Sequence, residues 1–188
     1  MRFLGINLQR SCSVTSGQIY ARVIDRERKG EYLGRTIQVI PHITQEIKLA
    51  IAHAAKTMEC DVLIVEVGGT VGDVEEAPFL EALREMRFEL GKENTLFVHV
   101  TWLPYVQVTE ELKTKPSQHS LRALRSIGII PDVVIARADH QIDRSLCEKL
   151  AHAESISPSN VIPLSTEKIA YKVPLILEKE GLGTCVIK

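Results

Sequence analysis

The run DVLIVEVGGTVGDVEEAPFLEAL, residues 61–83, is the feature that most constrains how this chain folds. Its apolar residues Val62 to Val65 predict a strand that is covered on both faces of a parallel sheet. Glu66 follows at the carboxyl end of that strand, where the ligand crevice of an open α/β sheet lies. The glycines permit close approach to the backbone, and Pro78 suits the first turn of a helix. We therefore expect a strand, a ligand-binding loop and a helix, although a simple turn with Glu66 on the surface explains the same pattern.

Strand and helix patterns alternate along the rest of the chain. Strands are expected at residues 36–40, 62–66, 95–102, 132–136 and 160–164. Helices are expected at residues 15–24, 43–58, 78–90, 117–127, 145–152 and 174–181. This alternation predicts an α/β fold, in which a doubly wound, mainly parallel sheet carries helices on both faces.

Composition favours a single globular domain over residues 1–188. The chain is 45% hydrophobic and 25% charged, which suffices for a sizeable core. Its formal net charge of −1 gives no support for binding nucleic acid or an anionic membrane. No apolar run approaches the ~20 residues of a membrane span, so a soluble, cytoplasmic protein is expected.

The cysteines and histidines give little support for a metal centre. The four cysteines form no CxxC pair, which favours reduced thiols over disulfides or zinc. The six histidines form no HxH or HxxxH pair. His99 and Trp102 fall in an apolar strand, and we expect both to be core residues.

Charged side chains in two loops suggest phosphate and metal binding. Glu66 offers the hard oxygen ligand that Mg²⁺ prefers. Lys113 and Lys115 precede Pro116, and each ammonium supplies a charge and three donors for a triphosphate. A helix starting near Ser117 would add free N–H groups and the positive end of its dipole. The alternative is an ordinary solvated loop with two lysines.

Several long stretches together resemble one protein family. These are EELKTKPSQHSLRALRSIGIIPDVVIAR (residues 110–137), RERKGEYLGRTIQVIPHIT (residues 26–44) and HVTWLPY (residues 99–105). With the GGTVGDVE loop, they are similar to the synthetase (amidoligase) domain of CTP synthase. The resemblance covers nearly the whole chain and implies a P-loop NTPase-like α/β fold.

The resemblance also implies which residues bind ligands. In the family, residues of both loops and one further lysine contact UTP or the feedback inhibitor CTP; the matching residues are Asp73, Val74, Glu75, Lys113, Thr114, Lys115, Pro116, Ser117, Gln118 and Lys149. Glu66 matches a magnesium ligand. The stretch that contacts adenine corresponds to Ser165, Thr166 and Glu167, but relatives usually have a basic residue followed by Asp-Val there. Recognition of ATP is therefore the least supported part of the assignment.

The family's reaction joins three substrates. ATP phosphorylates O4 of UTP, and ammonia released by a glutaminase domain displaces the phosphate to give CTP, in a homotetramer. This sequence contains no G-x-x-x-x-G-K-[ST] motif, so the ATP-cradling loop is missing. We therefore expect a partial synthetase domain, truncated at its N-terminus, that lacks the glutaminase domain and is inactive alone. The alternatives are a non-catalytic nucleotide-binding or assembly fragment and, less compatible with KTKPSQHS, a dethiobiotin-synthetase-like ligase.

Overall fold

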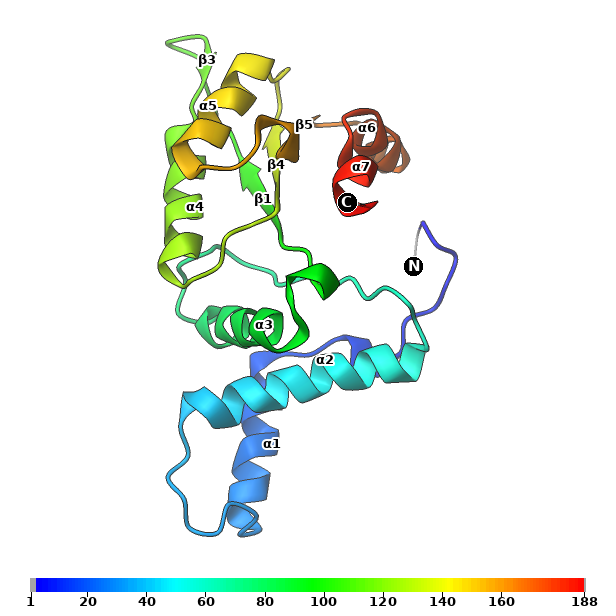
Figure 1. Cartoon of the computed structure of the whole chain (residues 1–188), viewed down its shortest axis with the longest axis vertical. Helices are drawn as coiled ribbons and strands as arrows, with labels where there is room; N and C mark the ends of the chain where they lie inside the picture. Colours follow the sequence, from blue (N-terminus) through cyan, green and yellow to red (C-terminus); the bar gives the residue numbers. More distant parts are fainter. Residues whose placement is uncertain (1–2, 188) are drawn as a thin grey trace. The chain divides into compact units, whose positions relative to one another are not determined.

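The computed structural model divides into two compact units, Met1–Gly91 and Lys92–Lys188 (Figure 1). The structure describes residues 3–187, and of Glu154 only the backbone. The first unit contains η1 (Arg10–Cys12), α1 (Ser16–Arg28), η2 (Val39–Ile43), α2 (Thr44–Met58) and α3 (Ala77–Leu90). The second contains η3 (Lys92–Asn94), β1 (Val98–Trp102), β2 (Tyr105–Val106), β3 (Glu111–Leu112), α4 (Lys115–Ser126), β4 (Val133–Ala138), α5 (Arg144–Glu154), η4 (Pro158–Asn160), β5 (Val161–Ser165), η5 (Ala170–Lys172), α6 (Val173–Lys179) and α7 (Leu182–Ile187).

The first unit is built from three helices around an aliphatic core. Helix α1 begins with a capping box, in which the Thr15 hydroxyl accepts from the Gln18 N–H and the Gln18 side chain accepts from the Thr15 N–H. The core side chains come from all three helices and from η2; they are Ile19, Val23, Ile43, Ile47, Ala50 and Ala82. Burial of these apolar groups is the main source of stability in this unit.

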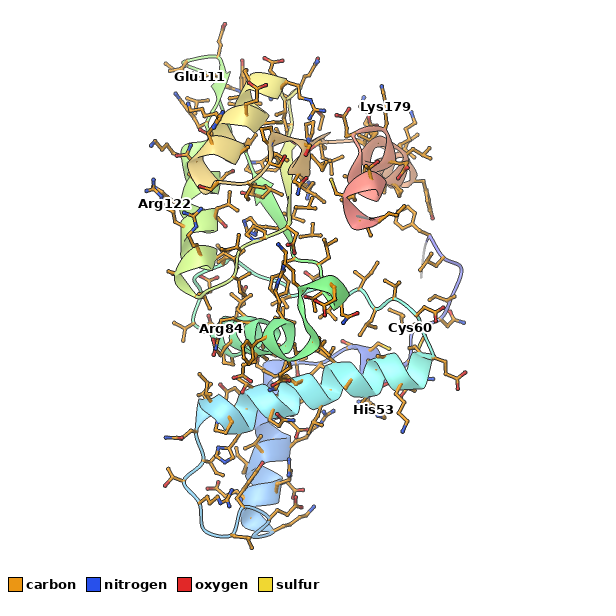
Figure 2. The ribbon with its side chains drawn as sticks, viewed as in Figure 1. His53, Cys60, Arg84, Glu111, Arg122 and Lys179 are labelled. Atoms are coloured by element: carbon orange, nitrogen blue, oxygen red, sulfur yellow. The ribbon has the colours of Figure 1, made fainter. Side chains whose placement is uncertain are left out.

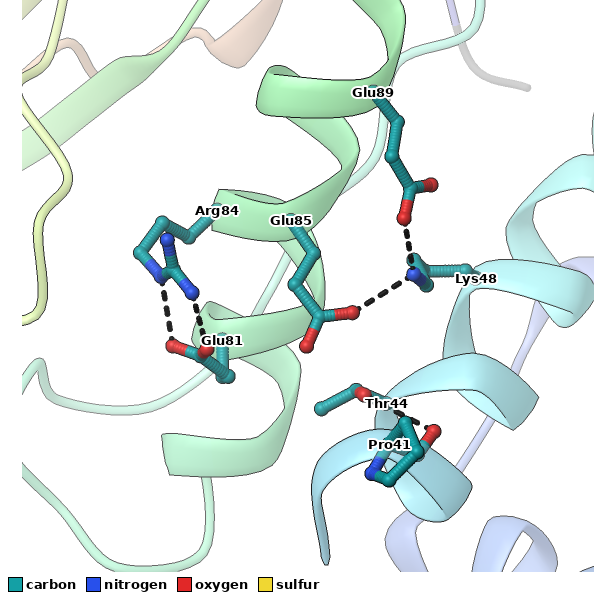
Figure 3. Close-up of polar contacts among 7 residues, drawn as sticks. All are labelled: Pro41, Thr44, Lys48, Glu81, Arg84, Glu85 and Glu89. Atoms are coloured by element: carbon teal, nitrogen blue, oxygen red, sulfur yellow. Dashed lines mark hydrogen bonds and ion pairs between the residues drawn. The ribbon is translucent and has the colours of Figure 1, made fainter.

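A buried lysine joins α2 to α3 (Figure 3). The Lys48 ammonium lies 2.8 Å from a Glu85 carboxylate oxygen and 2.6 Å from one of Glu89. These contacts raise the pKa of Lys48 although its burial acts in the opposite direction. Within α3, the Arg84 guanidinium donates two hydrogen bonds to the Glu81 carboxylate. The charged side chains thus fix how α3 lies along α2.

The second unit is organised by a three-stranded parallel sheet with strand order β1-β4-β5. Val98 of β1 pairs with Val133 of β4, and Trp102 pairs with Arg137. Val134 of β4 pairs with Val161 of β5. The carboxyl ends of all three strands therefore meet at one edge, which is where open α/β sheets bind ligands.

Helices cover both faces of this sheet. On one face, Val134 and Ala136 pack with side chains of α4 and α5, including Leu121 and Leu150. On the other, Val133, Ile135, Ile162 and Leu164 pack against partly buried residues of α6 and α7. The structure therefore confirms the predicted fold class, a mixed α/β arrangement with a parallel sheet flanked by helices.

Two predicted strands are wrong. Residues 62–66 are irregular, and Val62 and Ile64 are 79% and 87% exposed. No neighbouring strand among residues 3–187 supplies a ladder for them, and an apolar run becomes a buried strand only with such a partner. Residues 36–40 lead instead into η2, because Pro41 lacks an N–H and the Gln38 N–H donates to the His42 ring.

The structure also contains strands β2 and β3 and helix α7, which were not predicted, and it differs from expectation at some boundaries and at one core residue. Helix α4 begins at Lys115, two residues before the predicted start, since Pro116 is favoured in a first turn. Strand β4 continues to Ala138, so that Arg137 lies inside it. Trp102, expected in the core, is 42% exposed because it lies on the outer face of an edge strand. In residues 3–187, no helix is both long enough and apolar enough to cross a membrane.

Candidate functional site

Residues 113–120, which we call the lysine loop, follow a short hairpin and include the beginning of α4. Strands β2 and β3 pair antiparallel, and the Lys113 N–H then donates to the Pro104 carbonyl at 2.9 Å. The loop therefore leaves the hairpin beside the carboxyl end of β1. It enters α4 directly, with Lys115 as the first helical residue.

Three of the predicted ligand contacts in this loop point into the protein. Thr114, Ser117 and Gln118 are only 4%, 0% and 5% exposed. The Ser117 hydroxyl donates to the Trp102 carbonyl at 2.9 Å, and the Gln118 amide donates to the Thr114 hydroxyl at 3.3 Å. These side chains shape the loop from within.

The lysines remain at the surface. Lys115 and Pro116 are exposed. Lys113 is partly exposed, and its ammonium forms a hydrogen-bonded ion pair with the carboxylate of Glu111 in the hairpin. Glu111 is labelled in Figure 2. This hydrogen bond lowers the pKa of Glu111, and the charge of Lys149 lowers it further. Lys113 and Lys115 thus lie at the start of α4, and Lys149 lies on α5.

The glycine loop, residues 68–75, lies in the first unit and presents acidic groups. Asp73, Val74 and Glu75 are exposed, as is Glu66 just before the loop. The Asp73 N–H donates to the Thr70 carbonyl at 3.0 Å, which closes a turn. None of these four side chains is buried. Packing therefore does not hold them in place as it holds the inward-facing side chains of the lysine loop.

Glu76, which the sequence did not single out, folds back onto the glycine loop. The residue is 8% exposed, and a Cβ on Gly69 would overlap its carboxylate. Gly69 also has φ +111°, a conformation that other residues rarely adopt. The backbone conformation therefore favours glycine at position 69, and a Cβ there would in addition force the Glu76 side chain to move.

Neighbouring carboxylates make Glu76 hard to ionise. Burial raises the pKa of Glu76 most, and the negative charges of Asp73, Glu75 and Glu66 raise it further, while a hydrogen bond from the Thr70 N–H opposes them. Charge of this kind favours a bound cation. Within residues 3–187, however, no group of three or more His, Cys, Asp or Glu side chains is arranged to hold a metal ion. A cation at Glu66 would need water and nucleotide oxygens to complete its ligands.

The predicted adenine-contact residues lie at the carboxyl edge of the sheet, where Ser165 ends β5 and Thr166 and Glu167 follow it. The Ser165 hydroxyl donates to the His140 carbonyl at 3.2 Å. Thr166 turns toward β4, and its hydroxyl lies 2.7 Å from an Asp139 carboxylate oxygen. Ser165 and Glu167 line a cavity of about 430 Å³. Two of the three predicted residues thus lie beside a depression in the second unit.

The charge of this cavity is unsuited to polyphosphate. Its charged lining residues are Asp143, Glu167, Glu180 and a single cation, Arg144. Three carboxylates against one guanidinium repel a triphosphate, whereas their oxygens accept hydrogen bonds from an amino group. The cavity is thus compatible with a base or an amine and not with a phosphate chain.

The whole chain matches a protein-family model. Residues 1–188 match the model described as "CTP synthase N-terminus". The chain belongs to the CTP synthase N-terminal family. It is 53% identical over 187 residues to a CTP synthase of Chloroflexus aggregans and 52% identical over 186 residues to one of Dehalococcoides mccartyi. These matches cover 100% and 99% of this chain but 34% of each relative, so the chain spans about a third of their length.

The family match supports the resemblance that was found from the two loops.

The structure also shows aromatic contacts that no sequence motif predicted. The Arg137 guanidinium lies over the Trp102 ring at 5.8 Å. The rings of Tyr105 and His140 stack with centroids 3.8 Å apart. Both pairs bridge segments that are distant in sequence, and Trp102 and Arg137 are direct partners in the β1-β4 register.

The prediction that His99 is a hydrogen-bonded core residue is confirmed. It is 8% exposed, and its Nε2 lies 3.0 Å from the Ser120 hydroxyl of the lysine loop. His99 thus belongs to the support of the lysine loop, a role that its place in an apolar strand does not reveal.

Proposed function

We propose that this chain is the pyrimidine-nucleotide-binding part of a CTP synthase, with the lysine loop as its triphosphate contact. The single observation that carries the proposal is the exposure of Lys113 and Lys115 on a loop whose Thr114, Ser117 and Gln118 are buried. Such a loop holds its cations in place before a ligand arrives, which lowers the entropic cost of binding.

Lys149 is the proposed third cation of this contact. Its charge already acts on Glu111, the partner of Lys113. A nucleotide triphosphate supplies the negative charge that three lysines attract, and it would replace Glu111 as the partner of Lys113. Asp73, Val74 and Glu75 are proposed to contact the ribose or base of a nucleotide, since carboxylates accept hydrogen bonds from hydroxyl and amino groups. In the family the nucleotide lies at a subunit interface, so Asp73 and Lys113 of one chain need not share a pocket.

Glu66 is proposed as one ligand of a Mg²⁺ ion that also contacts substrate phosphates. Its carboxylate is exposed and lies among other acidic groups, as a hard cation requires. When bound, the metal would neutralise phosphate charge during phosphoryl transfer.

In the complete enzyme, the proposed reaction is the family's: ATP phosphorylates O4 of UTP, and ammonia from a glutaminase domain displaces phosphate to give CTP. Ser165, Thr166 and Glu167 are proposed to contact the adenine of ATP, because the cavity beside them accepts an amino group and repels phosphate. For the chain alone we propose binding of UTP and CTP without turnover.

Calorimetric titration of UTP with Mg²⁺ tests the proposal. Replacing Lys113 or Lys115 by Ala removes a charged hydrogen bond of roughly 1.5–3 kcal/mol, so UTP affinity should fall about tenfold or more. Lys179→Ala is the matched control, because this exposed lysine lies on α6, across the sheet from α4. Equal UTP binding by all four proteins, or tight ATP binding without pyrimidine preference, would contradict the proposal.

We also propose that the chain forms a homo-oligomer, as the tetrameric family does. Val98, Val100 and Trp102 are 42%, 54% and 42% exposed on one face of edge strand β1. An exposed apolar edge strand favours association. Light scattering on dilute protein should give a mass above the monomer; a monomer whose mass does not change with UTP would contradict this.

A further inference from the structure

Two hydroxyl contacts hold the beginning of α4 against strand β1. The first is the bond from Ser117 to the Trp102 carbonyl, at the end of the strand. The second lies one helical turn later, where the Ser120 hydroxyl meets Nε2 of His99 at 3.0 Å. Together they fix both the position and the rotation of the turn that begins with Lys115.

The second contact depends on a histidine that is kept neutral. His99 is buried, and burial is the one cause that lowers its pKa. The elements packed against it do carry charged or titratable groups, but these side chains are exposed; they are Lys115, His119, Arg122 and Arg125 on α4 and Arg137 on β4. Arg122, for example, lies on the outer side of α4 (Figure 2). No carboxylate from these elements compensates a charge on the ring.

We propose that His99 and Ser120 are positioning residues, which hold the first turn of α4 so that the lysine loop presents its cations to a triphosphate, and that acid releases this turn. The inference rests on the proposed nucleotide function of the lysine loop and adds to it a means of regulation. Neither residue is itself a nucleotide contact, because His99 is a buried residue of β1 and Ser120 lies on the side of α4 that faces this strand.

The direction of the pH effect follows from burial. The unfolded histidine titrates near its ordinary pKa of about 6.5, whereas the buried ring in the folded protein resists protonation. Below that pH, states in which His99 is exposed gain a proton and are favoured. Support of the lysine loop is therefore complete above about pH 6.5 and declines as the pH falls.

UTP titrations on three variants test the inference. Ser120→Ala removes the hydroxyl contact and should weaken UTP binding about three- to tenfold at pH 7.5. Ser126→Ala is the matched control on the same helix, because its hydroxyl bonds only to the Ala123 carbonyl. His99→Gln keeps a neutral hydrogen-bonding group near the place of Nε2 and cannot titrate, so it should bind UTP like the parent at pH 7.5.

The pH profile separates positioning from mere packing. Between pH 7.5 and 5, the parent should lose at least about threefold more affinity than His99→Gln, since the phosphates of UTP titrate identically in both experiments. A parent and a His99→Gln variant with the same pH profile would overturn the inference, as would a Ser120→Ala variant with parental affinity.

Hydrogen exchange keeps the test independent of the proposed function. If the parent chain binds no UTP, the proposed nucleotide contact fails, but the support of α4 can still be measured at the amides of residues 118–121. Ser120→Ala should speed their exchange about threefold or more, whereas Ser126→Ala should not. Unchanged exchange in Ser120→Ala would overturn the inference on its own.

Discussion

The glycine loop and the lysine loop are equally distinctive as sequence, yet the protein supports them in different ways. The lysine loop turns Thr114, Ser117 and Gln118 inward and bonds to the main chain of β1. The glycine loop follows an exposed irregular segment, and its main internal support is Glu76 folded against Gly69. A motif therefore predicts that a loop matters, but the surrounding packing decides how firmly that loop is held.

The two loops also respond oppositely to protons. Glu76 beside the glycine loop is held toward its neutral, protonated form, because its pKa is raised by burial and by nearby carboxylates. His99 behind the lysine loop is held in its neutral, deprotonated form, because burial lowers its pKa. Acid should therefore favour the native glycine loop and weaken the support of α4.

The largest effect is expected from a substitution that disrupts the support of the glycine loop. Gly69→Ala places a Cβ where the Glu76 carboxylate lies and forces a non-glycine residue to φ +111°. We expect a loss of about 1–3 kcal/mol in the free energy of unfolding of the first unit, measured by denaturant titration. Gly68→Ala is the control, since its Cβ would lie at an ordinary 3.5 Å from the Glu66 carboxylate. Equal stability of the two variants would show that Glu76 moves aside without cost.

A smaller effect tests the support of the lysine loop. Ser117→Ala leaves the Trp102 carbonyl without its hydroxyl donor in a fully buried position. Loss of such a bond costs about 1–2 kcal/mol, and the midpoint of thermal unfolding of the second unit should fall accordingly. Ser126→Ala, at the exposed end of α4, should change the free energy of unfolding by no more than about 0.5 kcal/mol and so leave the midpoint nearly unchanged. A Ser117→Ala variant as stable as this control would remove the contrast between the loops.

The smallest expected effect concerns the charge of Glu76. The raised pKa means that Glu76 binds a proton more tightly in the folded state than in the unfolded state. Protonation of Glu76 therefore stabilises the fold at low pH, and this stabilisation is lost as the pH rises through the pKa of Glu76 in the folded state. Glu76→Gln should therefore raise stability at pH 7 by no more than about 0.5–1 kcal/mol, with little change near pH 4. Chemical denaturation at the two pH values measures the difference, and a variant less stable at pH 7 would show that the ionised carboxylate is stabilising.

Features fixed by neighbouring residues could be predicted from the sequence. The helix expected to start near Thr15, the helix that begins around Pro78 and the β4 and β5 strands appear close to where their patterns put them. The two lysines were correctly placed next to the start of a helix, although Lys115 is itself the first residue of α4.

Features fixed by distant residues could not be predicted. The apolar residues Val62 to Val65 predict a buried strand, but burial depends on a partner strand that lies elsewhere in a chain. The family resemblance marked Ser117 and Gln118 as ligand contacts, whereas their inward direction depends on β1. Glu76 was passed over because nothing in its immediate sequence shows that it folds back onto Gly69.

Trp102 gives this protein a built-in optical reporter. It is the single tryptophan of the chain, so intrinsic indole emission comes from one place in the second unit. Its ring lies beneath Arg137, and its carbonyl receives the Ser117 hydroxyl. A shift in emission wavelength or lifetime would therefore register a displacement of α4 or of that guanidinium, whereas far-ultraviolet circular dichroism follows the helices of both units. Disagreement between the two signals during melting would show that the units unfold separately.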